Sequence, residues 1–194
     1  MTSSGPSRPA VILTTARLVL REMNDDDAPF ILELLNDPSF IKNIGDRHVR
    51  TLDDARGYIR NGPADSYEQH GFGLWLVQLT AGTPIGMCGL LKRDILDDVD
   101  IGFAYLPPFQ SKGYGFEAAR AVLDYARDVL RLRRVVAIVN ADNQASAKLL
   151  EKLGMAFERM VQPFADEPPL KLFGVPGLRA RRGQAPYRGA NEGG

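Results

Sequence analysis

The sequence predicts one domain of the α+β class, built on a mixed and mostly antiparallel sheet. Three strand-like runs follow one another between short turns, at 71–80, 85–92 and 99–106, which is typical of an antiparallel meander. Strands and helices alternate only after these runs, whereas a doubly wound sheet alternates from its start. The predicted order of elements is β, α, α, β, β, β, α, β, α, β, β, which gives seven strands.

The first elements follow from alternation and from helix-capping signals. Residues 15–22 alternate apolar and charged side chains, which indicates a strand. Acids and side-chain oxygens at 24–27 favour a helix start, and the Asn-Asp-Pro sequence at 36–38 ends that helix. Residues 40–50 have no regular pattern, so we expect an irregular segment there. Thr51 then opens a second helix that runs through about Ile59.

The second half of the chain alternates regular elements. After the meander we expect a helix over 115–130, a strand over 134–139, a helix over 143–153 that ends at Gly154, and strands over 155–163 and 170–175. Three segments are therefore predicted: a flexible tail at 1–11, the folded domain at 12–176, and a flexible basic tail at 177–194.

Composition excludes several classes of protein. The chain of 194 residues has 24 Lys and Arg against 24 Asp and Glu, so its formal net charge is zero and nothing indicates nucleic acid or a membrane surface as a partner. The first residues lack the apolar core of a secretory signal, and we expect a cytoplasmic location. Cys88 is the only cysteine, which excludes an internal disulfide, and we expect no metal site.

The most informative segment is Gln110-Ser111-Lys112-Gly113-Tyr114-Gly115, between a predicted strand and a predicted helix. Two glycines around one residue let several backbone N–H groups point into one small space. Because the N-terminus of a helix adds positive potential, the backbone amides of Lys112 to Phe116 form an anion site. Its natural ligand is a phosphate or pyrophosphate.

Two alternatives exist for this loop. Residues 113–118 also fit a dinucleotide-binding fingerprint, and a connection without any ligand would need the same glycines. Three observations count against a dinucleotide: residues 107–112 separate the glycines from the strand, antiparallel strands precede the motif, and Asp142 lies farther on than the ~20 residues expected for a ribose-binding acid. A P-loop is excluded because no Gly-Lys-Ser/Thr follows.

Three motifs, in the correct order, resemble the GNAT acetyltransferases over residues 12–176. They are Gln110-x-x-Gly113-x-Gly115 after Ile101–Tyr105, then Asn140-x-x-Asn143-x-x-Ser146, then Leu150–Met155 with Phe157. Thr14-x-x-Arg17-Leu18-x-Leu20-Arg21 resembles the RimJ/RimL branch, which acetylates N-terminal amines of ribosomal proteins. The resemblance implies a GNAT fold with helices on both faces of the sheet, acetyl-CoA as co-substrate and a primary amine as acceptor. Homodimers are common in that branch.

The resemblance also assigns cofactor-binding roles. It implies that Phe103, Ala104 and Tyr105 pair with the pantetheine arm of CoA, and that a backbone N–H near Ala104 polarises the thioester. Asn143 would bond the same arm, although it is also suited to be a helix N-cap. The residues of the pyrophosphate loop would be Gln110, Ser111, Lys112, Gly113, Tyr114, Gly115 and Phe116.

Two residues are candidates for proton transfer. Asp100 shares a strand face with Gly102 and Ala104, so it is the predicted general base, although it could equally be a solvated turn acid beside Asp97 and Asp98. Ser146 is the predicted proton donor to the departing thiolate, although its hydroxyl could instead satisfy a neighbouring backbone group. Glu117 lies in the first turn of a helix, where an acid is favoured for structural reasons.

The acceptor is not identified by these motifs. We expect Phe40, Ile41, Ile44 and His48, in the irregular segment, to border the acceptor pocket. Two other functions remain as alternatives: a GNAT-fold module that binds acyl-CoA without turnover, and a dinucleotide-binding oxidoreductase.

Overall fold

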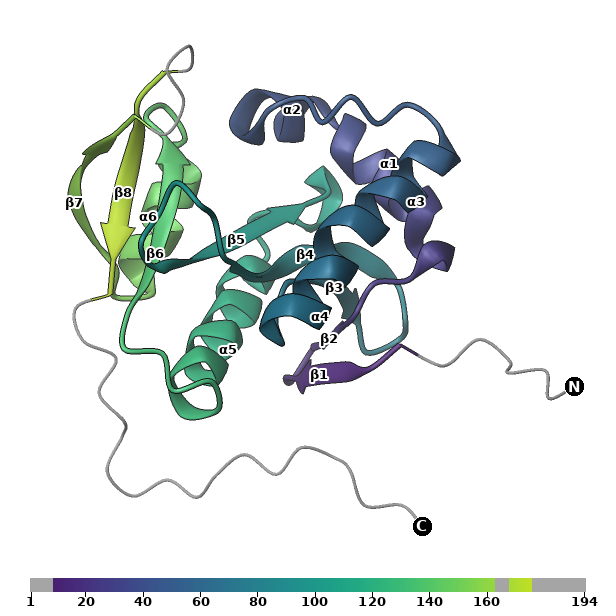
Figure 1. Ribbon diagram of the computed structural model, residues 1–194, viewed down its shortest axis with the longest axis horizontal. Coiled ribbons are helices and arrows are strands. Elements are labelled where there is room, and N and C mark those ends of the chain that lie inside the picture. Colours follow the sequence, from purple (N-terminus) through teal and green to yellow (C-terminus); the bar gives the residue numbers. More distant parts are fainter. Residues whose placement is uncertain (1–8, 163–167, 176–194) are drawn as a thin grey trace, which may run out of the picture.

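The computed structural model describes residues 9–162 and 168–175, and its centre is one eight-stranded sheet in the order β1-β2-β3-β4-β5-β6-β8-β7 (Figure 1). Every neighbouring pair is antiparallel except β5 and β6, which are parallel. This confirms the mixed α+β class and removes the structural basis for a doubly wound dinucleotide fold. The strands are β1 (Val11–Thr14), β2 (Leu18–Arg21), β3 (Leu74–Leu79), β4 (Pro84–Leu91), β5 (Val99–Tyr105), β6 (Val135–Asn140), β7 (Ala156–Val161) and β8 (Leu170–Gly174).

The predicted count of seven strands was wrong by one, because β1 was missed. Its four residues pair only with β2, and a strand so short shows little alternation in the sequence. β1 begins at Val11, inside the segment predicted as a tail at 1–11. Most of that tail, and all of the basic tail predicted at 177–194, lie outside the described residues.

Helices cover both faces of the sheet, as expected. One face carries α5 (Tyr114–Asp128) and α6 (Gln144–Lys152), and the other carries α1 (Ala28–Asn36), α2 (Pro38–Ile44), α3 (Leu52–Ile59) and α4 (Asp65–His70) (Figure 1). The central strand β3 is buried on both sides, since Trp75 and Val77 pack in the core under α5 while Leu74 and Leu76 pack in the core under α1 and α3.

Two helices differ from the sequence prediction. α2 extends into the segment predicted as irregular at 40–50, and Asp37 caps it by accepting from the Ser39 backbone N–H, with Pro38 in the first turn. Proline disfavours the continuation of a helix, but it is common at the first position of a new one. Pro38 therefore follows the end of α1 and begins α2. The strand predicted over 71–80 begins only at Leu74, because α4 precedes it and Gly71 ends α4 with φ 73°.

A π-helical segment, Arg60–Ala64, joins α3 to α4. A short 3-10 turn at Asp25–Asp27 leads into α1. Another at Pro107–Phe109 leads into the loop at 110–115, which we call the anion loop. The other helices and strands of the prediction are confirmed to within a few residues at each end.

β3 and β4 approach very closely at one point. A Cβ atom on Gly89 would overlap the carbonyl oxygen of Gly73, so only glycine fits there. The neighbouring Cys88 is fully buried in the core, and burial raises the pKa of its thiol to about 12. Cys88 is therefore a core residue, as predicted.

The sheet opens between β5 and β6. The two strands pair only at Val99–Val135 and Asp100–Val136, and beyond these pairs the remaining residues of each strand diverge. β6 continues its pairing with β8 on its far side, so the opening leaves one edge of β5 without a partner strand among the described residues. This split in the sheet is where the site forms.

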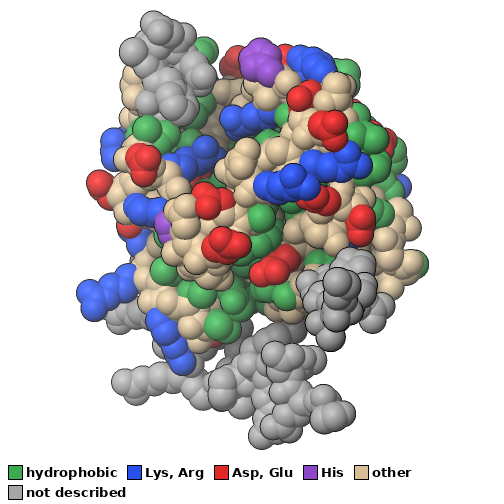
Figure 2. Space-filling view, turned by 45° about the vertical axis from the view of Figure 1, so that its right-hand side comes forward, with side chains coloured by type: hydrophobic (Ala, Val, Ile, Leu, Met, Phe, Trp, Pro, Cys, Tyr) green, Lys and Arg blue, Asp and Glu red, His purple; other side chains and the backbone are tan. Residues whose placement is uncertain are grey.

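The surface carries no large area of one charge on the face shown in Figure 2, where basic and acidic side chains are interspersed. Among the described residues, no helix is long and apolar enough to cross a membrane.

Candidate active site

A cavity of about 970 Å³ occupies the split between β5 and β6 and reaches helices on both faces of the sheet. Its lining brings together residues that are far apart in the sequence, from α2, β5, the anion loop, β6 and α6. The predicted β5 residues Phe103, Ala104 and Tyr105 all line it.

Along β5, the backbone N–H groups point alternately toward β4 and toward the cavity at the free edge. Leu106 donates its N–H to the Ile85 carbonyl across β4, and N–H groups of an antiparallel strand alternate in direction. The N–H of Ala104 therefore points toward β4, while those of Phe103 and Tyr105 point toward the opening. The carbonyl of Tyr105 points the same way as its N–H, and it accepts a hydrogen bond from Gln110 Nε2 at 2.8 Å.

The N-terminus of α5 lies at the loop that the sequence predicts as an anion site. Gly113 is the N-cap, with φ 83°, and no side chain caps the helix. Glu117 donates its N–H to the Gly113 carbonyl, so the first intrahelical bond begins after the amides of Tyr114, Gly115 and Phe116. These amides have no partner within the helix, and the helix dipole makes the position favourable for an anion.

An acid in the first turn of α5 would repel such an anion, but its charge is compensated. Glu117 accepts hydrogen bonds from Thr15 Oγ1 at 2.6 Å, from the Arg17 N–H at 2.9 Å and from Arg17 Nε at 2.6 Å. Although partial burial acts to raise the pKa of Glu117, these bonds hold it below its ordinary value. The structural role expected for Glu117 agrees with these contacts.

Arg17 also holds the loop itself. Its Nη1 donates to the Lys112 carbonyl at 3.2 Å, and its guanidinium lies 4.5 Å from the centre of the Tyr114 ring. Of the predicted loop residues, Gln110, Ser111, Gly113, Gly115 and Phe116 line the cavity, whereas Lys112 and Tyr114 do not. Lys112 Nζ instead lies 5.9 Å from the centre of the Phe109 ring.

Asp100 is a buried acid that is paired with Arg93. Its side chain is 1% exposed, and Arg93 Nε donates to both carboxylate oxygens at 3.1 Å. Burial raises the pKa of Asp100 above its ordinary value, although Arg93 and Lys92 act to lower it. Asp100 lines the cavity, and so it is not the solvated turn acid that the sequence left as an alternative.

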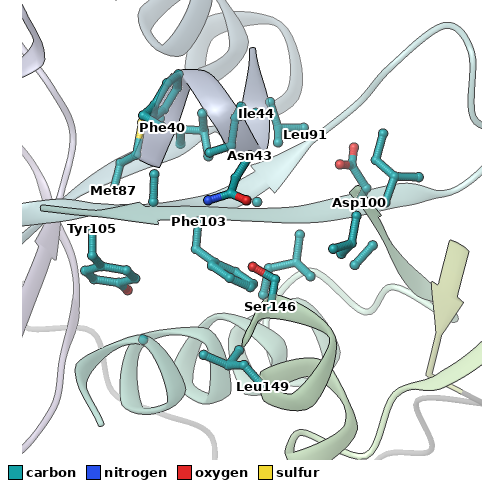
Figure 3. A pocket seen from close by; sticks show the side chains of 18 of the residues that line it. Phe40, Asn43, Ile44, Met87, Leu91, Asp100, Phe103, Tyr105, Ser146 and Leu149 are labelled. Carbon is teal, nitrogen blue, oxygen red and sulfur yellow. The ribbon is translucent and has the colours of Figure 1, made fainter. Parts of the chain in front are cut away.

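Asp100 and Ser146 lie on opposite sides of β5 (Figure 3). Asp100 is on the side of Leu91 and α2, and Ser146 is on the side of Phe103 and α6. The split in the sheet connects the two sides, so a molecule lying in it would meet both groups.

α6 places Ser146 and Asn143 in the lining. Asn143 is the N-cap of α6, since its Oδ1 accepts from the Ser146 backbone N–H at 3.1 Å. The Ser146 hydroxyl does not take part in this cap. The capping role expected for Asn143 is therefore present, and both side chains also border the cavity.

α2 forms a wall of the cavity opposite β5. Phe40 and Ile44 line the cavity as expected, whereas Ile41 and His48 are exposed and do not. Asn140, at the end of β6, holds the far end of α2 by donating from Nδ2 to the Asn43 carbonyl at 3.0 Å.

Several site residues were missed in the sequence. Arg93 follows β4 by two residues, and the register that pairs Leu91 with Asp100 brings it back over the acid. That pairing could have been found by aligning the two strands of the hairpin. Tyr58 and Arg47 also line the cavity, and their spacing carries no signal that would have identified them.

No group of three or more His, Cys, Asp or Glu side chains within 9–162 and 168–175 is arranged to hold a metal ion.

Comparison with known proteins decides the family. The family model of the acetyltransferase (GNAT) domain matches residues 17–156, which is well over half of the chain. The chain belongs to the GNAT acetyltransferases. Its eight-stranded sheet with helices on both faces is the GNAT fold expected from the sequence motifs.

Two relatives of this GNAT chain carry acetyltransferase names. An uncharacterised N-acetyltransferase of Bacillus subtilis, YnaD, is 29% identical over 146 residues, which cover 75% of this chain and 83% of the relative. An FsC-acetyl coenzyme A-N(2)-transacetylase of Aspergillus fumigatus is 27% identical over 168 residues, which cover 81% of this chain and 70% of the relative.

Solved structures share the GNAT fold. An acetyltransferase from Agrobacterium tumefaciens superposes with a TM-score of 0.72 at 24% identity, covering 84% of this chain and 92% of that one. RimL, a ribosomal L7/L12 α-N-protein acetyltransferase solved in complex with coenzyme A, superposes with a TM-score of 0.73 at 16% identity, covering 85% and 97%. At these identities the likeness shows the fold alone.

Proposed function

We propose that this chain transfers the acetyl group of acetyl-CoA to a primary amine, by direct attack of the amine while both substrates are bound. One observation carries the proposal: the anion site of α5, the free edge of β5 and the buried Asp100 open into a single cavity. Each of them supplies one requirement of the reaction, and neither of the two alternative functions uses all three.

The donor side fits CoA by its chemistry. The unpaired amides at the start of α5 suit its pyrophosphate, with Gln110, Ser111 and Gly113 around them. The outward backbone groups of Phe103 and Tyr105 suit the amides of its pantetheine arm, which would add to β5 as a further strand would. The same N–H groups are available to polarise the thioester carbonyl, a role that Ala104 cannot take because its N–H points to β4.

Two side chains would move the protons. Asp100 accepts the proton that the amine loses as its nitrogen bonds to the acetyl carbon. Ser146 donates a proton to the sulfur as the carbon–sulfur bond breaks. Their placement on opposite sides of β5 supports this division, because the amine approaches from the α2 side and the sulfur leaves from the α6 side.

The acceptor can be an N-terminal α-amine or a small amine. Deprotonating an α-amine at neutral pH costs about 1 kcal/mol, against about 4–5 kcal/mol for a lysine amine. An α-amine therefore demands less of Asp100. The motif around Arg17 supports a RimJ/RimL-like enzyme. We further propose that it acts in the cytoplasm through a domain at about 12–176, alone or as a homodimer.

The test is a screen of acetyl-CoA consumption against N-terminal peptides, amino acids, polyamines and aminoglycosides, with CoA binding measured separately by calorimetry. Turnover of an amine with release of CoA supports the proposal. Binding of CoA without turnover of any amine would instead support an acyl-CoA-binding module, and tight binding of NAD without CoA would overturn both.

A further inference from the structure

The acceptor side of the cavity, on the α2 face of β5, has hydrogen-bond donors without acceptors. Arg47, Tyr58 and Arg93 all line it. Burial raises the pKa of the Tyr58 hydroxyl, and the positive charges of Arg47 and Arg93 act to lower it. Within the described part of the chain, neither the Arg47 guanidinium nor the Tyr58 hydroxyl makes a hydrogen bond or an ion pair.

Asp100 occupies only one of the three guanidinium nitrogens of Arg93. The Nε of Arg93 bonds the Asp100 carboxylate, while its two terminal nitrogens make no hydrogen bond to the described residues. The side chain is 30% exposed and lines the cavity. A guanidinium has five N–H donors in a planar fork, and its free side matches a second carboxylate.

The acids in the lining do not cancel this excess of donors. Asp100 is already paired with Arg93, and Asp65 accepts a hydrogen bond from Gln69 on its own helix. Asp94 is exposed in the loop after β4. Lys92 adds a further cation, although its ammonium bonds the carbonyls of Leu96 and Asp97.

We propose that the acceptor is an amine that carries a carboxylate close to its amino nitrogen, as free α-amino acids do, and that Arg47, Tyr58 and Arg93 bind this carboxylate. The inference rests on the proposed acetyl transfer and names the class of its acceptor. The amino group then lies toward Asp100, which Arg93 links to the carboxylate end. A polyamine is disfavoured, because it would bring further positive charge to Arg47 and Arg93.

The test compares matched amines with the full-length protein at saturating acetyl-CoA. L-Phenylalanine and L-phenylalaninamide share an amino group and a side chain and differ in the carboxylate, as do leucine and leucinamide; spermidine is the polycationic arm. A nearby carboxylate raises the pKa of the amine, so the amides have more neutral amine at a given pH and the comparison is biased against the proposal. We expect kcat/KM to favour the amino acids by about tenfold or more.

Variants separate recognition from folding. Arg47→Met should lower kcat/KM for the amino acids about ten- to a hundredfold and leave that for the amides within about twofold. Tyr58→Phe should act in the same direction with a smaller effect. Arg56→Gln is the matched control, since Arg56 is an exposed cation of α3 that pairs with Asp53 outside the cavity.

Preference for the amides, for spermidine or for peptides alone would overturn the inference and leave the acetyltransferase activity standing. An equal loss for acids and amides in Arg47→Met would also overturn it. If CoA binds and no amine is acetylated, either in this test or in the wider screen of peptides, polyamines and aminoglycosides, the proposed function fails and this inference fails with it.

Discussion

Arg17 donates from its Nε to Oε2 of Glu117 at 2.6 Å, which joins the start of β2 to the first turn of α5. Since Arg17 also bonds the Lys112 carbonyl, one side chain fixes both the loop and the helix that form the anion site. The first strands of the chain thus support a site whose other residues come from the second half.

Replacing Arg17 with Ala should weaken CoA binding. The substitution frees the loop and leaves the Glu117 charge uncompensated beside the anion site. Because Arg17 is 47% exposed, solvent screens the pair, and we expect Kd for CoA to rise about three- to tenfold by calorimetry. Arg120→Ala, which removes an exposed pair with Asp124 from the same helix, is the control and should bind CoA normally. An unchanged Kd in Arg17→Ala would show that the loop holds its shape without this contact.

Replacing Asp100 with Asn should remove the general base. The amide keeps the size of the carboxylate but cannot take the proton, so kcat/KM should fall by about 10²–10⁴ while Kd for CoA stays unchanged. Asp98→Asn is the matched control, because Asp98 precedes the same strand and pairs with Arg134 away from the cavity. Similar activity in the two variants would assign Asp100 a structural role.

Arg93 should set the pH at which Asp100 becomes active. Burial raises the pKa of this carboxyl and Arg93 lowers it, so Arg93→Gln should raise the pKa further. A general base works only when deprotonated, so activity rises with pH through this pKa and the acidic limb of kcat/KM should move to higher pH. An acidic limb that stays in place or moves to lower pH would contradict this. Circular dichroism over the same pH range excludes unfolding as the cause.

Replacing Ser146 with Ala tests the proton donor with little disturbance of α6. The cap of this helix uses the Ser146 backbone N–H, which the substitution retains. We expect kcat to fall about ten- to a hundredfold with KM for acetyl-CoA nearly unchanged. Gln144→Ala, at an exposed position of the same helix, is the control. Unchanged turnover at every pH would remove Ser146 from the mechanism.

Two glycines should respond to alanine in opposite ways. Gly89→Ala places a methyl group against the Gly73 carbonyl and should destabilise the protein by about 1–3 kcal/mol or more. Gly57→Ala, in α3 with open space around its Cβ position, should stabilise it by about 1 kcal/mol. Thermal unfolding of both variants measures the difference. A lower Tm in Gly57→Ala, or no change in Gly89→Ala, would contradict the packing described here.

Local signals predicted most of the fold, and its failures have local causes. Alternation and caps identified seven of the strands and the helices α1, α3, α5 and α6. β1 was too short to show a hydrophobic period. α2 begins at Pro38, which was interpreted from the sequence only as the end of the preceding helix. β1 is defined by its pairing with β2, which its own segment does not show, whereas the Asp37 cap of α2 is a local signal that was not used.

The same distinction holds for the site. The glycines of the anion loop are visible in the sequence because the backbone itself demands them at φ 83°. The Arg93–Asp100 pair and the donors around Tyr58 depend on a hairpin register and on helices of the opposite face. The part of the candidate site that is formed by backbone amides could be predicted from the sequence. The part that is formed by side chains from separate elements required the structure.

The buried thiol of Cys88 has a practical consequence for every assay above. It is the only cysteine of the chain, it is fully buried, and its pKa of about 12 keeps it protonated at neutral pH. Thiol-reactive dyes modify thiolates that they can reach, so the folded protein should give no background signal. Free CoA, whose thiol appears when the acetyl group leaves, can therefore be followed continuously with such a dye in the presence of high enzyme concentrations, and any dye bound by the protein itself would report unfolding.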